Sequence, residues 1–284
     1  KLRKNGKWSN GDPVTAEDFV WSWQRILTAS LGSQYPDMLY YLEGAQEYHT
    51  GKNNDFDTVG VKAIDAHTLE VKLKAPTPFF TGLLSHYSTW PVHKETVLKH
   101  GSIDDRNGEW TRPGNFVCNG AFNLKSWELN NKIVVEKNPM YWDASTVQLN
   151  EIHYYPVSNV MTEDRMFRAG QLHVTSTLPS QKCSVYIEEN NPDLRIDPYM
   201  GTYFYRLNTT NPYLSDVKVR KALAYSIDRK LLVEKVTKCG QIPAYSFTPP
   251  GSNGYEPTTS IPFNPLLAKE LLVVAGFNSE NKFP

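Results

Sequence analysis

Two β-hairpins, with short helices between and after them, constrain this chain to a mixed fold of helices and antiparallel strands. Apolar and polar residues alternate over residues 59–63 and 69–73, on either side of a turn at residues 65–68. The same alternation recurs over residues 120–127 and 132–136. Because side chains alternate between the two faces of a strand, this pattern places the apolar residues of each strand on one face, toward a core. Because helices and hairpins follow each other irregularly, we expect an α/β or α+β fold with several subdomains.

The first helix has the clearest start signal in the sequence. Thr15 is a favourable N-cap residue, and Asp18 follows three positions later, where a capping box usually has Glu. Apolar residues then recur at helical spacing from Phe19 to Ile26. By similar reasoning we expect a short helix that includes Leu83 and Leu84, helices over residues 162–169, 216–227, 229–236 and 265–275, and strands over residues 152–157, 172–178 and 199–208.

Composition excludes some classes of protein. The 284 residues include 30 Lys plus Arg and 30 Asp plus Glu, so the formal net charge is zero and nucleic acid is not an expected partner. No apolar run approaches the roughly 20 residues that cross a bilayer. The 16 tyrosines suit a surface that binds many ligands through rings with a polar tip, although core packing explains the same composition.

The three cysteines, Cys118, Cys183 and Cys239, lie far apart and lack CxxC spacing. At most one disulfide can form among them. Our interpretation is that they are unpaired, small buried thiols.

Motifs of catalysis and metal binding do not occur in the sequence. It lacks G-x-S-x-G, H-E-x-x-H, the P-loop and G-x-G-x-x-G, and none of its seven histidines forms an i, i+4 pair on an expected helix. Acidic pairs such as Glu17–Asp18 are explained by helix capping. We therefore expect no enzyme, no metal site and no cofactor.

Four sequence blocks together resemble one family. They are WSNGDPVTAEDF at residues 8–19, NGAF at 119–122 with NPMYW at 138–142, DVKVRKAL through IDR at 216–229, and AKELL with AGF at 268–277. Their order and content are similar to family 5 of the extracytoplasmic solute-binding proteins, which includes the peptide receptors of ABC importers. Each block also has a structural reading, since the first is a capped helix and the third a pair of helices.

The resemblance implies an α/β fold of the periplasmic-binding-protein type, with two ligand-binding lobes and an extra α+β domain. We expect the extra domain over residues 1–95, part of the first lobe over residues 96–200 and the start of the second lobe over residues 201–284. In the family, the first block follows a signal peptide and initial strands, and a large segment follows the last block. We therefore expect a piece of a longer periplasmic protein, cut at both ends, with a signal peptide upstream.

The resemblance also implies a function. Two lobes would close on an oligopeptide, and the closed form, a monomer, would deliver it to the membrane permease of an ABC importer. The acid that pairs with the amino group of the ligand would lie beyond residue 284. Among the residues present, the expected ligand contacts are Tyr199, Tyr203, Tyr205 and Arg206 at a hinge strand, then Ser176 and Thr177, and finally Tyr40 and Tyr41 from the extra domain. For each tyrosine, core packing is the alternative role.

Two positions depart from the family pattern. Arg206 stands where the enteric peptide binder is expected to have an acid, a change that would either alter which ligand side chains are accepted or favour an acidic group. Gly201 stands where that relative has a disulfide cysteine, so that bridge should be absent. A receptor of the same fold for murein tripeptide, dipeptide, haem or a nickel complex remains the first alternative, and an unrelated hydrolase the second.

Overall fold

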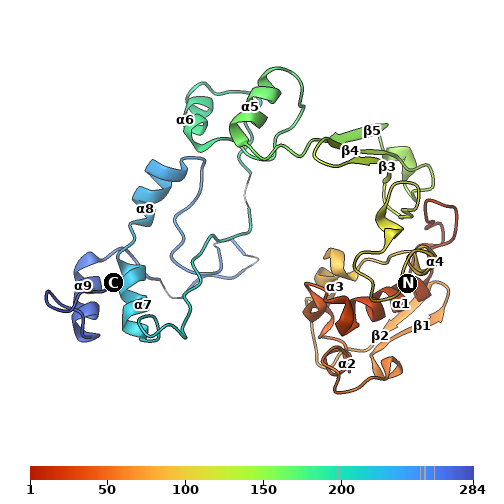
Figure 1. Cartoon of the computed structure of the whole chain (residues 1–284), viewed down its shortest axis with the longest axis horizontal. Coiled ribbons are helices and arrows are strands. Elements are labelled where there is room, and N and C mark those ends of the chain that lie inside the picture. Colours follow the sequence, from red (N-terminus) through yellow and green to blue (C-terminus); the bar gives the residue numbers. More distant parts are fainter. Residues whose placement is uncertain (198, 250, 253, 259) are drawn as a thin grey trace. The chain divides into compact units, whose positions relative to one another are not determined.

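A computed structural model describes residues 1–197, 199–249, 251–252, 254–258 and 260–284. The chain divides into two compact units, Lys1–Pro156 and Val157–Pro284, which are described separately below (Figure 1). None of the helices in these described ranges is both long enough and apolar enough to cross a membrane. The expected boundaries at residues 95/96 and 200/201 stay a prediction.

Unit 1 contains both predicted hairpins. Its helices are α1 (Ala16–Leu27), α2 (Ala45–His49), α3 (Phe80–Leu83) and α4 (Lys94–Lys99), and its strands are β1 (Val61–Asp65), β2 (Thr68–Val71), β3 (Phe122–Glu128), β4 (Lys132–Lys137) and β5 (Glu151–Tyr154). Short 3₁₀ turns connect them at Ala29–Leu31, Pro36–Leu39, Phe56–Thr58, Tyr87–Thr89, Glu109–Thr111 and Ala144–Thr146.

The main core of unit 1 lies between α1 and the β1–β2 hairpin. Its buried members are Trp23, Leu27, Leu39, Leu42, Ala45, Val59 and Val61. Because the Trp23 ring is buried, its indole nitrogen needs a partner, and it donates to the carbonyl oxygen of Thr89 at 2.9 Å. The core therefore fixes the segment before α4 as well as the hairpin.

The capping box at the start of α1 is confirmed. The backbone N–H of Thr15 donates to Asp18 Oδ2 at 2.7 Å, and Asp18 adds negative charge to the first turn. The polar segment at residues 100–113 packs against α1, because Arg25 donates to the carbonyl oxygen of Asp105 at 3.0 Å. Burial lowers the pKa of Arg25, and the charges of Asp105 and Asp104 oppose that effect.

The last element of unit 1 along the chain is a three-stranded antiparallel sheet, with β4 between β3 and β5. A bulge between Leu124 and Ser126 interrupts the β3–β4 register. Val134, on the central strand, is buried. At the sheet surface, Glu151 forms ion pairs with Lys125 and His153. The expected second hairpin and the strand near residue 152 are thus confirmed.

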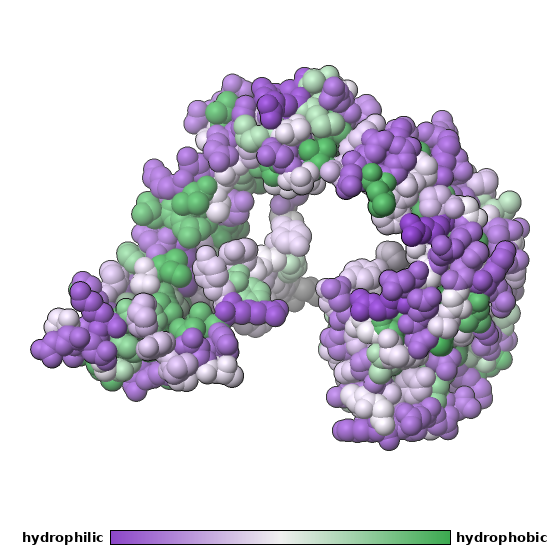
Figure 2. All heavy atoms as spheres, in the orientation of Figure 1, coloured by the Kyte–Doolittle hydropathy of each residue, from purple (hydrophilic) through white to green (hydrophobic). Residues whose placement is uncertain are grey.

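Unit 2 is helical in its described part. It contains α5 (Val160–Arg168), α6 (Ser180–Glu188), α7 (Val217–Tyr225), α8 (Arg229–Leu232) with the adjoining π-helical turn η7 (Val233–Thr237), and α9 (Pro265–Val274). The helices α7 and α9 pack together through small buried residues, Val219 and Ala222 on one helix and Ala268 on the other. Figure 2 shows hydrophobic surface over α8, where Leu231 and Leu232 are exposed.

Side-chain caps explain why three of these helices begin where they do. Before α7, the side chain of Asp216 accepts from the N–H of Lys218. Before α8, Asp228 accepts from the N–H of Leu231. Before α9, Asn264 accepts from the N–H of Leu267. Glycines in the left-handed conformation follow two of the helices, since Gly170 and Gly276 come after α5 and α9 with φ of 71° and 93°.

Two predicted strands are wrong. Residues 172–178 and the described residues of 199–208 form no strand. Sequence pattern and β-propensity favoured both, but a strand also needs a neighbour that pairs with its backbone. Within residues 199–208, the backbone N–H of Gly201 instead donates to the carbonyl oxygen of Tyr199 and forms a local turn.

The interpretation of the cysteines as unpaired thiols is also wrong for two of the three. Cys183 and Cys239 form a disulfide with a Cα–Cα distance of 5.4 Å across a sequence separation of 56 residues. Cys118 is free. Sequence spacing alone does not show that α6 and the turn after η7 approach each other, which is what allows this bond.

Candidate ligand-binding site

The predicted hinge segment is an extended, exposed run of aromatic residues in unit 2. Tyr199 is 88% exposed, Tyr203 is 89% and Tyr205 is 74%. The rings of Tyr203 and Tyr205 lie edge to face, 5.9 Å apart. In an extended chain, residues two apart project to the same side. The structure therefore brings these two predicted residues together as one aromatic surface that faces water.

Phe204 anchors this segment from the opposite side. Its ring contacts Phe247 edge to face at 4.9 Å. The guanidinium carbon of Arg206 lies 5.8 Å from the Phe204 ring centre. In the described part of the chain, Arg206 forms no ion pair, so its charge is available to a ligand.

Ser176 and Thr177 lie in an irregular loop rather than at the end of a strand. Glu163 of α5 fixes this loop, because its Oε1 accepts from the backbone N–H of Ser176 at 2.7 Å and from its hydroxyl at 3.1 Å. Glu163 is buried, whereas Ser176 and Thr177 are exposed. The loop therefore presents two hydroxyls from a fixed position.

The buried acid next to Glu163 was missed by sequence reasoning. Asp164 is only 2% exposed, yet it contacts two cations, Arg168 at 3.1 Å and Lys182 at 3.8 Å. It also accepts from the hydroxyl of Tyr186 at 3.0 Å. Since Lys182 and Tyr186 belong to α6, the carboxylate attaches α6 to α5. Burial raises the pKa of Tyr186, and the hydrogen bond to Asp164 raises it further.

Tyr40 and Tyr41 belong to unit 1 and are half-buried. Tyr40 packs on the main core and lies 5.8 Å from the His49 ring, while Tyr41 meets Phe79 edge to face at 5.3 Å. Burial raises the pKa of Tyr40, and the charge of Asp37 adds to this. For Tyr40, the structure supports the alternative role of core packing.

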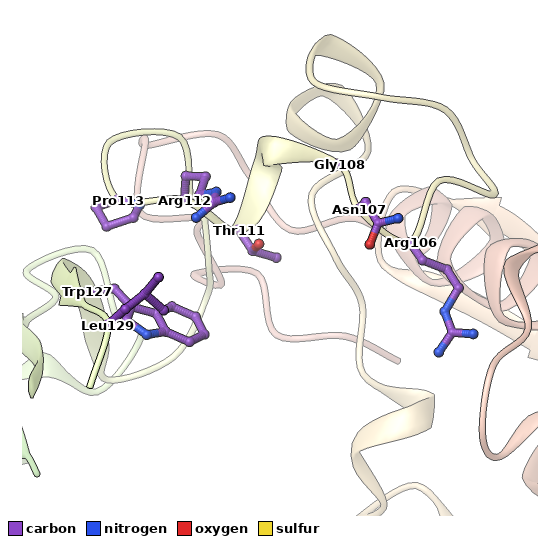
Figure 3. A pocket seen from close by; sticks show the side chains of 8 residues that line it. All are labelled: Arg106, Asn107, Gly108, Thr111, Arg112, Pro113, Trp127 and Leu129. Carbon is purple, nitrogen blue, oxygen red and sulfur yellow. The ribbon is translucent and has the colours of Figure 1, made fainter. Parts of the chain in front are cut away.

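A hollow in unit 1 contains none of the predicted ligand residues. Its volume is about 280 Å³, and Figure 3 shows the side chains that line it, among them Arg106, Arg112, Trp127 and Leu129. Figure 3 shows Trp127 and Leu129 side by side, while Arg106 points away from them. The charged and apolar groups therefore do not converge on one point. Within the described residues, no cluster of three metal-ligating side chains occurs either.

Comparison with known proteins gives the family. The sequence pattern of the bacterial extracellular solute-binding proteins, family 5 Middle, matches residues 1–283. The chain belongs to this family. By its description, the family consists of extracellular solute-binding proteins.

Individual family 5 members are similar over nearly the whole chain. The periplasmic oligopeptide-binding protein OppA of Escherichia coli is 40% identical over 98% of this chain and 52% of its own length. The periplasmic murein peptide-binding protein MppA of E. coli is 35% identical over 98% of this chain and 52% of its own length. This chain thus spans about half the length of these relatives.

A solved family 5 structure confirms the class of fold. OppA of Burkholderia pseudomallei superposes with a TM-score of 0.86 at 36% identity, covering 99% of this chain and 56% of that protein. The expectation of an α/β, periplasmic-binding-protein-like fold of the large peptide-binding class is therefore correct.

Proposed function

We propose that this protein captures oligopeptides outside the cytoplasm and delivers them, as a monomer, to the membrane permease of an ABC importer. The observation that carries the proposal is the exposed pair Tyr203 and Tyr205, with Arg206 on the Phe204 side of the same segment, in a chain 40% identical to an oligopeptide-binding protein. Tyrosine rings contact ligand side chains of many shapes, and their hydroxyls bond to backbone or water. A receptor of broad specificity needs such adaptable contacts.

The fixed hydroxyl loop gives a second contact surface of a different kind. The Ser176 hydroxyl already donates to Glu163, so it can accept from a peptide N–H, whereas the Thr177 hydroxyl can donate or accept. The peptide backbone that they would contact is the same in every ligand. Glu163 positions Ser176 before any ligand arrives. Main-chain recognition by these groups and side-chain contact by the tyrosines together support binding that depends weakly on ligand sequence.

Two observations support a place outside the cytoplasm. Both E. coli relatives are named periplasmic proteins. The Cys183–Cys239 disulfide suits an oxidising compartment, because cytoplasmic thiols are normally kept reduced. We propose a periplasmic location, reached by means of a signal peptide.

A murein peptide is the second candidate ligand, and Arg206 is the residue that favours it. A free guanidinium beside an aromatic surface attracts carboxylates, which murein peptides carry. The similarity to MppA, at 35% identity, is consistent with this ligand. It would make the protein a receptor for acidic peptides in particular.

Native mass spectrometry of gently purified protein, expressed from its complete gene, tests the proposal. A ladder of added masses that sequence as mixed peptides is the expected result. One uniform added mass would overturn broad peptide capture, and a single murein peptide would establish the second candidate. If the spectrum is empty, titration calorimetry with tri-alanine and longer alanine peptides decides, since no binding in that series contradicts the proposal.

The role of Arg206 needs its own variant. We expect Arg206→Glu to lower the affinity for Glu-Ala-Glu relative to Lys-Ala-Lys by tenfold or more, about 1.4 kcal/mol. Lys221→Glu, an equal charge change on the exposed face of α7, is the matched control and should leave the ratio unchanged. An equal effect of both variants would show a general field effect rather than contact with the ligand.

A further inference from the structure

The disulfide of this protein joins two segments with different expected roles. Cys183 lies on α6, within the region 96–200 that we assign to the first lobe. Cys239 lies in the turn after η7, within the region 201–284 that we assign to the second lobe. The bond therefore connects the chain before the hinge segment with the chain after it.

Few other interactions hold these two regions together in the described residues. The hydroxyl of Ser252 lies 3.1 Å from the sulfur of Met200, which is a weak acceptor. Ile196 packs closely on the turn, since a Cβ added at Gly240 would lie 2.9 Å from its Cγ2. The hinge segment itself adds no strand pairing. The covalent bond is thus the strongest restraint between the two regions.

An open groove of about 420 Å³ lies beside the bond. Ser184, Ile187 and Glu188 of α6 line one side, and residues of η7 and the following turn, including Lys235, Lys238 and Gly240, line the other. The groove leaves part of the facing surfaces of α6 and the turn out of contact, so the covalent bond contributes more to the attachment between them.

We propose that the Cys183–Cys239 disulfide is a tether that limits how far the two lobes open, and that it slows the exchange of bound peptide. The proposal rests on the proposed function and on the lobe boundary near residue 200. Closing and opening of such receptors is a rotation about a few hinge residues. A covalent link beside the hinge reduces the amplitude of that rotation, whereas the same lobes without it sample wider openings.

The attachment of α6 to α5 strengthens the tether. Asp164 of α5 attaches α6 through Lys182 and Tyr186, which lie one and three residues from Cys183. The adjacent acid, Glu163, fixes the loop of Ser176. Cys183 is therefore connected, through α6 and α5, to the loop that we expect to contact the ligand. It does not lie on a helix that moves independently of that loop.

The bond also makes the tether responsive to reductants. A dithiol reduces it by thiol–disulfide exchange, in which the S–S bond breaks, both cysteines regain S–H bonds and the dithiol becomes a disulfide. The lobes of the reduced protein should then open further and release peptide faster. Cys239 is half-buried and Cys183 is 1% exposed, so attack is expected at the sulfur of Cys239.

The test measures lobe motion and peptide exchange separately. In protein from the complete gene, unnatural amino acids at the exposed positions Glu189 and Lys221 carry a fluorophore pair for single-molecule energy transfer. Cys183→Ser, Cys239→Ser and dithiothreitol remove the tether, and Cys118→Ser, which keeps the bond, is the matched control. Without peptide, we expect a narrow distance distribution in the oxidised protein and the control, and a broader one with longer distances after removal.

Peptide exchange is followed with fluorescent tetra-alanine by stopped flow. Removal of the tether should raise the dissociation rate by about tenfold or more, because affinity changes in one binding site act mainly on dissociation. An unchanged distance distribution in all variants overturns the tether, whatever the binding. A changed distribution without any peptide binding keeps the tether and overturns the proposed function, so the two failures are distinguishable. A changed distribution with an unchanged dissociation rate overturns control of exchange.

Discussion

The indole nitrogen of Trp8 donates a hydrogen bond to Asp18 Oδ2 at 3.3 Å, which connects the first residue of the opening sequence block to its helix cap. The same oxygen accepts from the backbone and the hydroxyl of Thr15, at 2.7 and 3.1 Å. Trp8 is 1% exposed, so its N–H needs this partner. Within this block, one carboxylate therefore accepts hydrogen bonds both from the start of the helix and from a buried indole ring.

We predict that Asp18→Ala destabilises the protein by about 2–3 kcal/mol. The change removes the cap and leaves the buried N–H of Trp8 without its acceptor, and each loss costs about 1 kcal/mol or more. Urea unfolding followed by tryptophan fluorescence measures it. Glu17→Ala, at the exposed neighbouring position, should cost less than about 0.5 kcal/mol. Equal losses would contradict the role of Asp18.

Cys118 should react slowly with thiol reagents at pH 8 and faster as the pH rises. Burial raises the pKa of its thiol above the ordinary 9.0, and hydrogen bonds involving Gly120 and Ser9 oppose part of that effect. The sulfur donates to the carbonyl of Phe122 at 3.3 Å, which also favours the protonated form. The rate with iodoacetamide against pH, in the oxidised protein, should therefore have its midpoint above that of free cysteine.

The same raised pKa predicts a loss of stability in alkali. The folded thiol holds its proton more tightly than the unfolded one, so this contribution to stability is complete below the unfolded pKa. It declines as the pH rises through the folded pKa. Unfolding of wild type and Cys118→Ser between pH 8 and 11 checks the sign. A wild-type curve that gains stability relative to the variant with rising pH contradicts the prediction.

The disulfide should also stabilise the fold. Closing a loop with a separation of 56 residues reduces the entropy of the unfolded chain, an effect of about 4 kcal/mol in the chain-entropy model. We expect Cys239→Ser to lower the free energy of unfolding by about 2–4 kcal/mol, measured in guanidinium chloride. Cys118→Ser keeps the bond and should lose less than about 1 kcal/mol. A similar loss in both variants would show that the bridge adds nothing.

Glu163→Ala should loosen the loop of Ser176. The change removes the acceptor of the Ser176 backbone N–H, so exchange of that amide with solvent should accelerate by about tenfold or more. Hydrogen exchange read by mass spectrometry measures it, and Glu189→Ala, on the exposed end of α6, is the control. Unchanged exchange in 171–179 would mean that other contacts hold the loop.

Tyr203→Ala should weaken peptide binding by about 1–2 kcal/mol without changing stability, because the ring is exposed and packs little on the protein. Calorimetry with tetra-alanine and thermal unfolding give the two numbers. Tyr154→Ala, an equally large change at an exposed position of β5, is the control. A loss of stability with intact binding would show instead that Tyr203 supports the fold.

Local signals were the reliable part of the sequence. Thr15 with Asp18 predicted the start of α1, because a cap acts within one helical turn. The hairpins were predictable for the same reason. Each needs only its own turn and its own alternation to pair.

Features that depend on distant partners were not predictable. The aromatic run at residues 199–208 has strand composition, but the described residues provide no paired neighbour. Cys183 and Cys239 meet only because α6 and the turn after η7 come together. Glu163 and Asp164 lie in a helix that the sequence predicts, but only the fold shows that both are buried and that Glu163 accepts from Ser176. For the site, the family resemblance indicated the tyrosines of residues 199–205 but not the acids that support the neighbouring loop.

The contact of Phe204 with Phe247 makes the length of the hinge segment as important as its composition. Because alternate residues project to opposite sides, inserting one residue between Phe204 and Tyr205 would move Tyr205 and the residues after it to the other side relative to Phe204. Any redesign of ligand preference can therefore exchange side chains at Tyr203, Tyr205 and Arg206, but it must keep the number of residues between them.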